Sequence, residues 1–369
     1  MSTMLPSPPK TLGRLGDVLI SALASAQGLN NPLQLPKRRS VCVLLVDGLG
    51  SSNLSSAGGH ARYLNSLKAD KISSFYPSTT STSLTSLATG LSPSETGFIG
   101  YQVFNRDTKT SLNLLSGWES KEQAIKIQAQ RTISETSVEA GIFFDVVSPE
   151  IYRDSGFTSA TMRGSSFHGV NDVAARFTKA AELLRQSSSR VVYLYVPELD
   201  QIAHGFGSES TKWLNAIEDL DGYISNFVAM LPKDTGLLIT ADHGVIDVPK
   251  ENHRYIDEVL AKDCFEFVGG DTRGLFLYCK DNVEAVTEIL IKNYSHDCYI
   301  TTSAQLIESG YWTETEIQKR FLPDLVLLAK RNVALFHRGF AKVKSLNMIG
   351  HHGSITSEEL SIPLIRLGF

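Results

Sequence analysis

Four short runs of apolar residues along the chain are bounded by turn residues and contain few polar positions. They cover residues 41–46, 141–147, 191–196 and 236–240 (VCVLLV, GIFFDVV, VVYLYV and GLLIT). A half-buried strand alternates apolar and polar side chains, whereas a continuous apolar run is typical of a strand that is covered on both faces. The pattern therefore predicts the central strands of a largely parallel sheet.

Apolar residues at helical spacing occur between these runs. Residues 171–186, with Asn171 as a candidate N-cap, and residues 210–231 read as helices, and a shorter helix is expected at 16–26. Strands that alternate with helices indicate a layered α/β fold in which helices flank the sheet.

The pattern changes after residue 249. CFEFVGG, RGLFLYCK and CYITT read as short strands around one helix, VEAVTEILIKNY, and a last strand, LSIPLIRLGF, ends the chain. We expect an N-terminal tail and short helix at 1–36, a core formed by 37–249 and 339–369, and a small inserted α+β cap at 250–338.

Composition narrows the class of protein. The 369 residues are 42% hydrophobic and 20% charged, as is ordinary for a globular protein, and the net charge of -4 gives no basic footprint for a nucleic-acid polymer. No apolar run reaches membrane-spanning length. The first residues are too polar and proline-rich for a good signal peptide, and the four cysteines are scattered. These features predict a cytoplasmic protein without a membrane span.

Side chains that can bind metal follow three of the apolar runs. Asp47 follows the first, Asp200 and His204 follow the third, and Asp242 and His243 follow the fourth. Ligands of open parallel sheets bind at the carboxyl ends of the strands, so these side chains should share one edge. Alone, Asp47 reads more simply as a turn residue and Asp200 and His204 as a cap and a surface residue, whereas Asp242 and His243 alone are balanced between a structural and a metal-binding interpretation. Together, carboxylates and imidazoles indicate a transition-metal site.

Two further segments add to this chemistry. The GHHG segment supplies another imidazole, from His351 or His352. A hydroxyl-rich segment at 78–86 leads into a helical pattern with Leu84 and Leu87 on its apolar side. A threonine at the start of that helix would lie near the positive end of the helix dipole and could act as a nucleophile on phosphate, although such a segment alone would be a solvated loop.

The ordered motifs VDGLG, YPSTTSTSLTSLATGLSPSETG, PELDQIAHGFG, TADHG and GHHG resemble the alkaline phosphatase superfamily, and within it the type I phosphodiesterase/nucleotide pyrophosphatase family. The resemblance covers residues 41–248 and 350–354. It implies an alkaline-phosphatase-like sandwich with a largely parallel central sheet. It also implies hydrolysis of a phosphodiester or nucleotide pyrophosphate bond in a small phosphorylated substrate, such as a nucleotide.

The resemblance further implies two divalent metal ions. Zinc is preferred, with manganese or iron as alternatives, because three imidazoles take part. The residues that would hold one ion are Asp47, Asp242 and His243, and those that would hold the other are Asp200, His204 and His352.

The nucleophile of the family corresponds to Thr80, nine residues before Thr89 of the Thr-Gly-Leu segment, and Thr79 is its rival. Family phosphodiesterases carry a phosphate-binding asparagine where this chain has Tyr101, whose phenol can also donate a hydrogen bond. The Phe-Pro-Asn that usually follows the nucleophile is replaced by residues 81–83, Ser-Thr-Ser. The choice of substrate is therefore open.

Other functions fit the same residues. A phosphomonoesterase or a phosphonate hydrolase of the superfamily is one alternative, and a non-catalytic binding protein that keeps the fold is another. A sulfatase is disfavoured because its Cys/Ser-x-Pro-x-Arg motif is absent. His168 and Arg163 are weighed as pocket residues against a surface loop. The remaining histidines and the tryptophans are expected to be structural or exposed: His60, His253, His296, His337, Trp118, Trp213 and Trp312.

Overall fold

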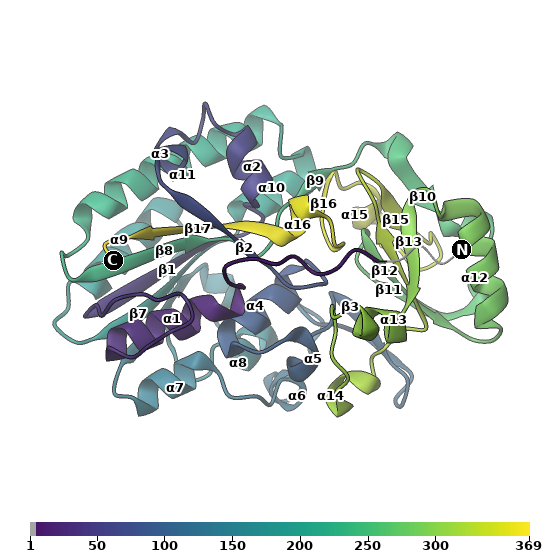
Figure 1. Cartoon of the computed structure of the whole chain (residues 1–369), viewed down its shortest axis with the longest axis horizontal. Coiled ribbons are helices and arrows are strands. Elements are labelled where there is room, and N and C mark those ends of the chain that lie inside the picture. The colour runs from purple at the N-terminus through teal and green to yellow at the C-terminus, as the bar shows by residue number, and fades with distance from the viewer. Residues whose placement is uncertain (1–4) are drawn as a thin grey trace.

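A seven-stranded sheet forms the centre of the computed structural model, which describes residues 5–369. Helices lie on both of its faces, and a second, smaller sheet lies at one end of the molecule (Figure 1). The seven strands are β1 (Ser40–Val46), β2 (Ala69–Ser73), β5 (Phe143–Ser148), β6 (Ser166–Gly169), β7 (Arg190–Val196), β8 (Thr235–Thr240) and β17 (Ser361–Leu367).

The sheet is largely parallel, as the apolar runs predicted. Its order is β2-β17-β8-β1-β7-β5-β6, and β1 pairs in parallel with both β7 and β8, with Val41 opposite Val191 and Gly236. Strand β17 is antiparallel to both β8 and β2. Every residue of β1, β7 and β8 is buried, which explains why these strands have no polar face.

The predicted helices are present with small shifts of their ends. They are α1 (Gly16–Gln27), α9 (Val173–Leu184) and α11 (Thr211–Met230). The N-cap of α9 is Asp172, whose side chain accepts a hydrogen bond from the Ala175 amide, and the prediction of Asn171 was wrong. The Asn171 side chain instead accepts a hydrogen bond from the amide of Glu150.

The second sheet is antiparallel, in the order β11-β12-β14-β13 (Phe265–Gly270, Gly274–Cys279, Leu325–Ala329 and Cys298–Thr302). Helix α12 (Val283–Tyr294) packs against it, and together they bury a hydrophobic cluster separate from the main core. These elements lie inside the segment expected to form an inserted cap. The division of the chain into these domains stays a prediction.

Shorter elements connect these layers. They are α2 (Ser51–Ser56), α3 (Arg62–Ser66), α4 (Thr80–Thr89), α5 (Pro93–Thr96), β3 (Gln102–Asn105), β4 (Thr110–Asn113), α6 (Lys121–Ile127), α7 (Ile133–Glu139), η1 (Glu150–Tyr152), α8 (Gly156–Thr161), α10 (Glu198–Phe206), β9 (Ile246–Asp247), η2 (Lys250–Asn252), β10 (His253–Tyr255), η3 (Ile256–Glu258), η4 (Lys262–Cys264), α13 (Ser303–Glu308), α14 (Glu316–Lys319), β15 (Ala334–Phe336), α15 (Val343–Leu346), β16 (Gly350–His351) and α16 (Ser357–Leu360).

A fully buried ion pair joins the second sheet to the end of the chain. Arg273, just before β12, donates from Nε and Nη2 to the two carboxylate oxygens of Glu359 in α16, at 2.9 and 3.1 Å. The same carboxylate accepts the Ser354 amide at 2.9 Å, and Arg273 Nη1 donates to the Val333 carbonyl at 2.6 Å. The pair therefore fixes the turn before β12 against the GHHG segment.

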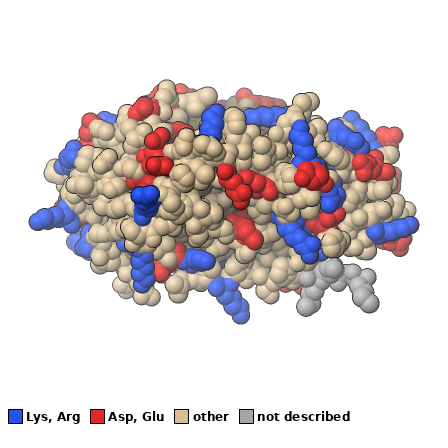
Figure 2. All heavy atoms as spheres, turned by 90° about the horizontal axis from the view of Figure 1, so that it is seen from above, with Lys and Arg blue, Asp and Glu red and all other residues tan. Residues whose placement is uncertain are grey.

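Charged residues of both signs are interspersed over the face drawn in Figure 2, which agrees with the small net charge. Within residues 5–369, no helix has the length and apolar character needed to cross a bilayer. All four cysteines are free thiols. The cellular location stays a prediction.

We predict that Arg273→Ala lowers the free energy of unfolding by about 3–5 kcal/mol, because it leaves the Glu359 carboxylate buried and unpaired. Chemical denaturation measures this change. The matched control is Arg338→Ala, which removes the half-exposed ion pair with Asp257 and should cost about 0–1 kcal/mol. Equal losses in the two variants would contradict the structural role of the buried pair.

Candidate active site

Three neighbouring strands deliver the predicted metal ligands to one edge of the sheet. Asp47 follows β1 directly, and Asp242 and His243 follow β8. Asp200 and His204 lie one turn apart on α10, which follows β7. Because β8, β1 and β7 are adjacent and parallel, their carboxyl ends meet, as the sequence predicted.

The first cluster consists of Asp47, Asp242 and His243, all buried, with one candidate ligand atom from each within 4.8 Å of the others. His243 Nε2 lies 3.3 Å from Asp242 Oδ2 and 3.5 Å from Asp47 Oδ1. This is the grouping that the family resemblance implied for one ion.

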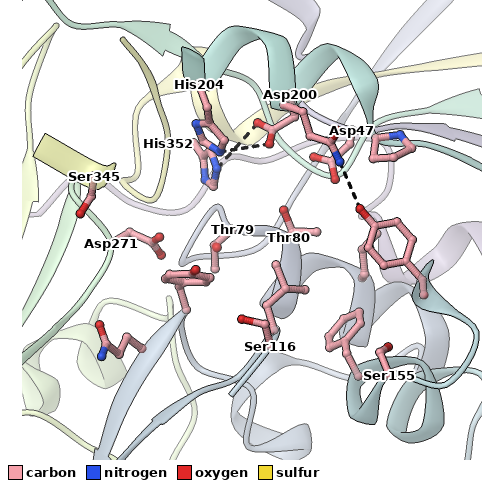
Figure 3. A pocket seen from close by; sticks show the side chains of 18 of the residues that line it. Asp47, Thr79, Thr80, Ser116, Ser155, Asp200, His204, Asp271, Ser345 and His352 are labelled. Carbon is pink, nitrogen blue, oxygen red and sulfur yellow. Dashed lines mark hydrogen bonds and ion pairs between the residues drawn. The ribbon is translucent and has the colours of Figure 1, made fainter. Parts of the chain in front are cut away.

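The second cluster consists of Asp200, His204 and His352 (Figure 3). His204 Nε2 lies 3.1 Å from Asp200 Oδ2, and His352 Nε2 lies 3.8 Å from Asp200 Oδ1. The rings of His243 and His352 stack with their centroids 3.8 Å apart, so the two clusters adjoin. The six predicted ligands therefore form two groups in one site.

The three imidazoles of these clusters share one orientation. Each Nδ1 faces a backbone carbonyl oxygen: Gly350 at 2.8 Å for His204, Gly244 at 3.3 Å for His243 and Ser78 at 2.9 Å for His352. A carbonyl only accepts hydrogen bonds, so Nδ1 carries the proton, and in a neutral ring Nε2 presents its lone pair. These lone pairs face carboxylate oxygens, an arrangement typical of histidines that bind metal.

The carboxylates of the clusters also lack partners. Asp47 Oδ1, Asp200 Oδ1 and Asp242 Oδ2 are buried and make no hydrogen bond. Burial and the neighbouring carboxylates raise the pKa of Asp47 well above its usual range, and burial above all raises the pKa of Asp242 to about 7. Divalent cations held between these oxygens and the Nε2 atoms would satisfy both sets of atoms, so the residues fit a metal site.

The protonation of the imidazoles agrees with this fit. Burial lowers the pKa of His243 to about 3, and burial together with His243 lowers that of His352 well below its usual range, so both rings are neutral at pH 7. Burial also disfavours the charged form of His204, but the adjacent Asp200 carboxylate raises its pKa to about 9. A bound cation would replace that proton, because metal ligands must be deprotonated.

The two candidate nucleophiles face different neighbours. Helix α4 begins at Thr80, and Thr79 is its N-cap residue. The Thr80 hydroxyl Oγ1 lies 3.2 Å from His243 Nε2, beside the first cluster. Thr79 lies beside Asp271 instead, as Figure 3 shows. Of the two hydroxyls, that of Thr80 is in contact with a predicted metal ligand.

A cavity of about 760 Å³ opens onto the clusters and both threonines. Tyr101, the predicted substrate-binding residue, lies in its wall. Much of the wall is aromatic: Trp118, Tyr152, Phe157, Phe167, Tyr193, Tyr195, Phe336 and Phe340. A cavity of this size and lining suits an organic ligand with a planar ring.

The structure also gives the surroundings of several other residues that the sequence singled out. Trp118 stacks on Phe98, as expected for a packing residue, and His337 is buried and accepts the Gly339 amide; both also line the cavity. His351 Nε2 donates to the Met348 carbonyl at 3.2 Å and its Nδ1 lies 2.7 Å from Thr272 Oγ1, so His352 and not His351 joins the second cluster. The side chains of His168 and Arg163 are bound to other parts of the protein, outside the cavity lining.

Two polar residues of the site were not predicted from the sequence. The Tyr195 hydroxyl donates to Asp47 Oδ2 and so orients a predicted ligand. Its signal was present, because Tyr193 and Tyr195 interrupt an otherwise aliphatic strand. Asp271 brings a further carboxylate from the turn between β11 and β12 to the cavity. No motif marks this residue in the sequence.

Comparison with known proteins gives a consistent picture. Residues 41–355 match a family described as type I phosphodiesterase/nucleotide pyrophosphatase. No curated protein matches the sequence. Similar solved structures include murine ectonucleotide pyrophosphatase/phosphodiesterase 5, with a TM-score of 0.71 at 18% identity, and the human protein, with a TM-score of 0.70 at 16% identity. Each alignment covers 88% of this chain and 87% of the other.

An inactive threonine-to-alanine variant of the murine protein in complex with AMP is also similar, with a TM-score of 0.69 at 17% identity over 88% of this chain and 87% of that one. At such identities the likeness establishes the shared fold. The family match, in contrast, spans most of the sequence. The chain therefore belongs to the type I phosphodiesterase/nucleotide pyrophosphatase family and is a hydrolase of phosphoester bonds.

Proposed function

We propose that the protein is a metal-dependent phosphodiesterase or nucleotide pyrophosphatase that works through a phosphothreonine intermediate. The observation that supports this most strongly is the meeting of unpartnered carboxylate oxygens with imidazole lone pairs beside the Thr80 hydroxyl. Groups of this kind are costly to bury together unless cations lie between them.

Asp47, Asp242 and His243 would hold one divalent cation, and Asp200, His204 and His352 would hold the other. Zinc suits a mixed carboxylate and imidazole donor set, and manganese or iron are the alternatives. When bound, such cations act as Lewis acids that lower the pKa of a nucleophile and neutralise the charge of a phosphoryl group.

Thr80 is the proposed nucleophile. Its Oγ1 attacks phosphorus, the bond from phosphorus to the leaving-group oxygen breaks, and the departing alcohol or phosphate takes up a proton. The backbone amides at the start of α4 can receive the phosphoryl oxygens, because the first amides of a helix have no partner within it. Water then cleaves the phosphothreonine and restores the Thr80 hydroxyl.

A nucleotide is the proposed substrate group. The aromatic wall of the cavity can stack on a base, and Tyr101 has a phenol that can donate a hydrogen bond to a phosphate oxygen. The similar solved complex with AMP and an inactivating threonine-to-alanine change supports both the nucleotide and the threonine chemistry by analogy.

We predict that Thr80→Ala abolishes hydrolysis of bis-p-nitrophenyl phosphate, whereas Thr80→Ser keeps a reduced rate, because serine restores a hydroxyl at the same position. Release of p-nitrophenol measures both rates. Full activity of Thr80→Ala together with loss in Thr79→Ala would transfer the nucleophile to Thr79. If the metal-loaded wild-type protein cleaves neither this diester nor p-nitrophenyl phosphate, the enzymatic proposal fails.

We also predict that the purified protein holds roughly two divalent ions per chain, as a two-metal hydrolase requires. Mass spectrometry of the metals should find that Asp242→Asn and His352→Ala each lower this content. His351→Ala is the matched control, because its ring is bound to Thr272 and Met348 and should leave the content unchanged. Equal losses in His351→Ala and His352→Ala would count against the assignment.

A further inference from the structure

Asp271 is a carboxylate beside the nucleophile segment for which the chemistry above has no use. It lines the cavity, and its Oδ2 is buried without a hydrogen-bond partner. In Figure 3 its side chain points toward Thr79, the residue that precedes Thr80, on the side of the cavity nearer to His352 than to Asp47. Burial raises the pKa of this carboxyl to about 7, so above neutral pH it is a negative group close to any phosphoryl group that Thr80 attacks.

The turn that carries Asp271 is fixed on all sides. Its amide donates to the Gly274 carbonyl at 2.9 Å, and the Gly274 amide donates back at 3.2 Å. The next residue, Thr272, bonds His351, and Arg273 forms the buried pair with Glu359. A Cβ built on Gly353 would lie 2.5 Å from the Asp271 Cβ, so the backbone next to His352 packs directly against this side chain. The carboxylate therefore has a defined place rather than a mobile one.

Without Asp271, the positive charge of two bound cations and the negative charge of the cluster carboxylates would not balance. Two divalent cations would exceed the three carboxylates of the clusters by one positive charge, and Asp271 would cancel that excess. Of the described cavity residues, none is an arginine, and the two lysines, Lys342 at the N-cap of α15 and Lys344 in its first turn, are exposed. A phosphodiester carries one negative charge, whereas a phosphomonoester carries nearly two at neutral pH. None of the described residues that line the cavity is therefore a buried arginine or lysine that could neutralise the second negative charge of a phosphomonoester.

We propose that Asp271 is a specificity-determining residue, which selects singly charged phosphodiesters and rejects doubly charged phosphomonoesters by like-charge repulsion. The inference rests on the proposed function, because it requires the phosphoryl group to be bound at Thr80. It assigns to the turn between β11 and β12 a role in choosing the substrate, through one carboxylate. Specificity often depends on a repulsive group of this kind as well as on attractive contacts.

The test compares two substrates in Asp271→Asn, which removes the charge and keeps the size of the side chain. We expect the ratio of kcat/KM for bis-p-nitrophenyl phosphate to that for p-nitrophenyl phosphate to fall roughly tenfold or more, through a gain with the monoester. The matched control is Asp154→Asn, because Asp154 lines the same cavity but is exposed and paired with Lys121. Its ratio should equal that of the wild type.

Binding gives a second readout that does not depend on turnover. In the Thr80→Ala background at about pH 8, where AMP is doubly charged, Asp271→Asn should tighten AMP binding roughly tenfold or more, as measured by calorimetry. Binding of bis-p-nitrophenyl phosphate and the metal content should change little.

Equal changes for diester and monoester, or no change, would overturn the proposal and assign Asp271 a structural role or a protonated, hydrogen-bonding one. Weaker AMP binding in Asp271→Asn would overturn it as well. These outcomes differ from failure of the proposed function, in which the wild-type protein cleaves neither substrate or Thr80→Ala remains active.

Discussion

The site depends on one electrostatic constraint. Imidazole lone pairs and carboxylate oxygens face one another where both are buried. The Nε2 atoms of His243 and His352 point at carboxylate oxygens that have no hydrogen-bond donor, and the Nδ1 atoms of all three rings face backbone carbonyls. A protein interior tolerates such a meeting only when cations or protons are supplied, and burial accordingly raises the pKa values of Asp47 and Asp242. A proton on Nε2 cannot supply the positive charge in His243 and His352. Burial keeps both rings neutral, and their one proton lies on Nδ1, where it faces a carbonyl.

The fold serves this constraint through the order of its strands. Three adjacent parallel strands end at the same edge, and the buried aliphatic residues of β1, β7 and β8 hold those ends in register. The remaining ligand, His352, arrives from the far end of the chain. Its segment is fixed by the Ser78 carbonyl and by the Glu359 carboxylate, which also binds Arg273 at the edge of the second sheet. The second sheet and the proposed metal site are thus coupled through one buried ion pair.

The sequence predicted the parts of this design that follow simple periodic patterns. Continuous apolar runs indicated the central strands, and residues within a few positions of their ends supplied five of the six proposed ligands. The choice between His351 and His352 needed the resemblance to a family, since both precede a glycine region. Asp271 was beyond prediction, because only the packing of the second sheet against Gly353 brings it to the cavity. Trp118 packs against Phe98 as expected, but its place in the cavity wall was not predicted, because packing and exposure to a cavity leave the same signal in a sequence.

The central claim is that cations occupy the space between the six ligands. X-ray diffraction from crystals of the protein, with data collected on both sides of the absorption edge of the metal found in solution, tests it most directly. We predict two anomalous peaks, one at about 2.0–2.2 Å from ligand atoms of Asp47, Asp242 and His243 and one at the same range from Asp200, His204 and His352. A metal-replete crystal with no peak at either cluster, or with its peaks elsewhere, would contradict the account.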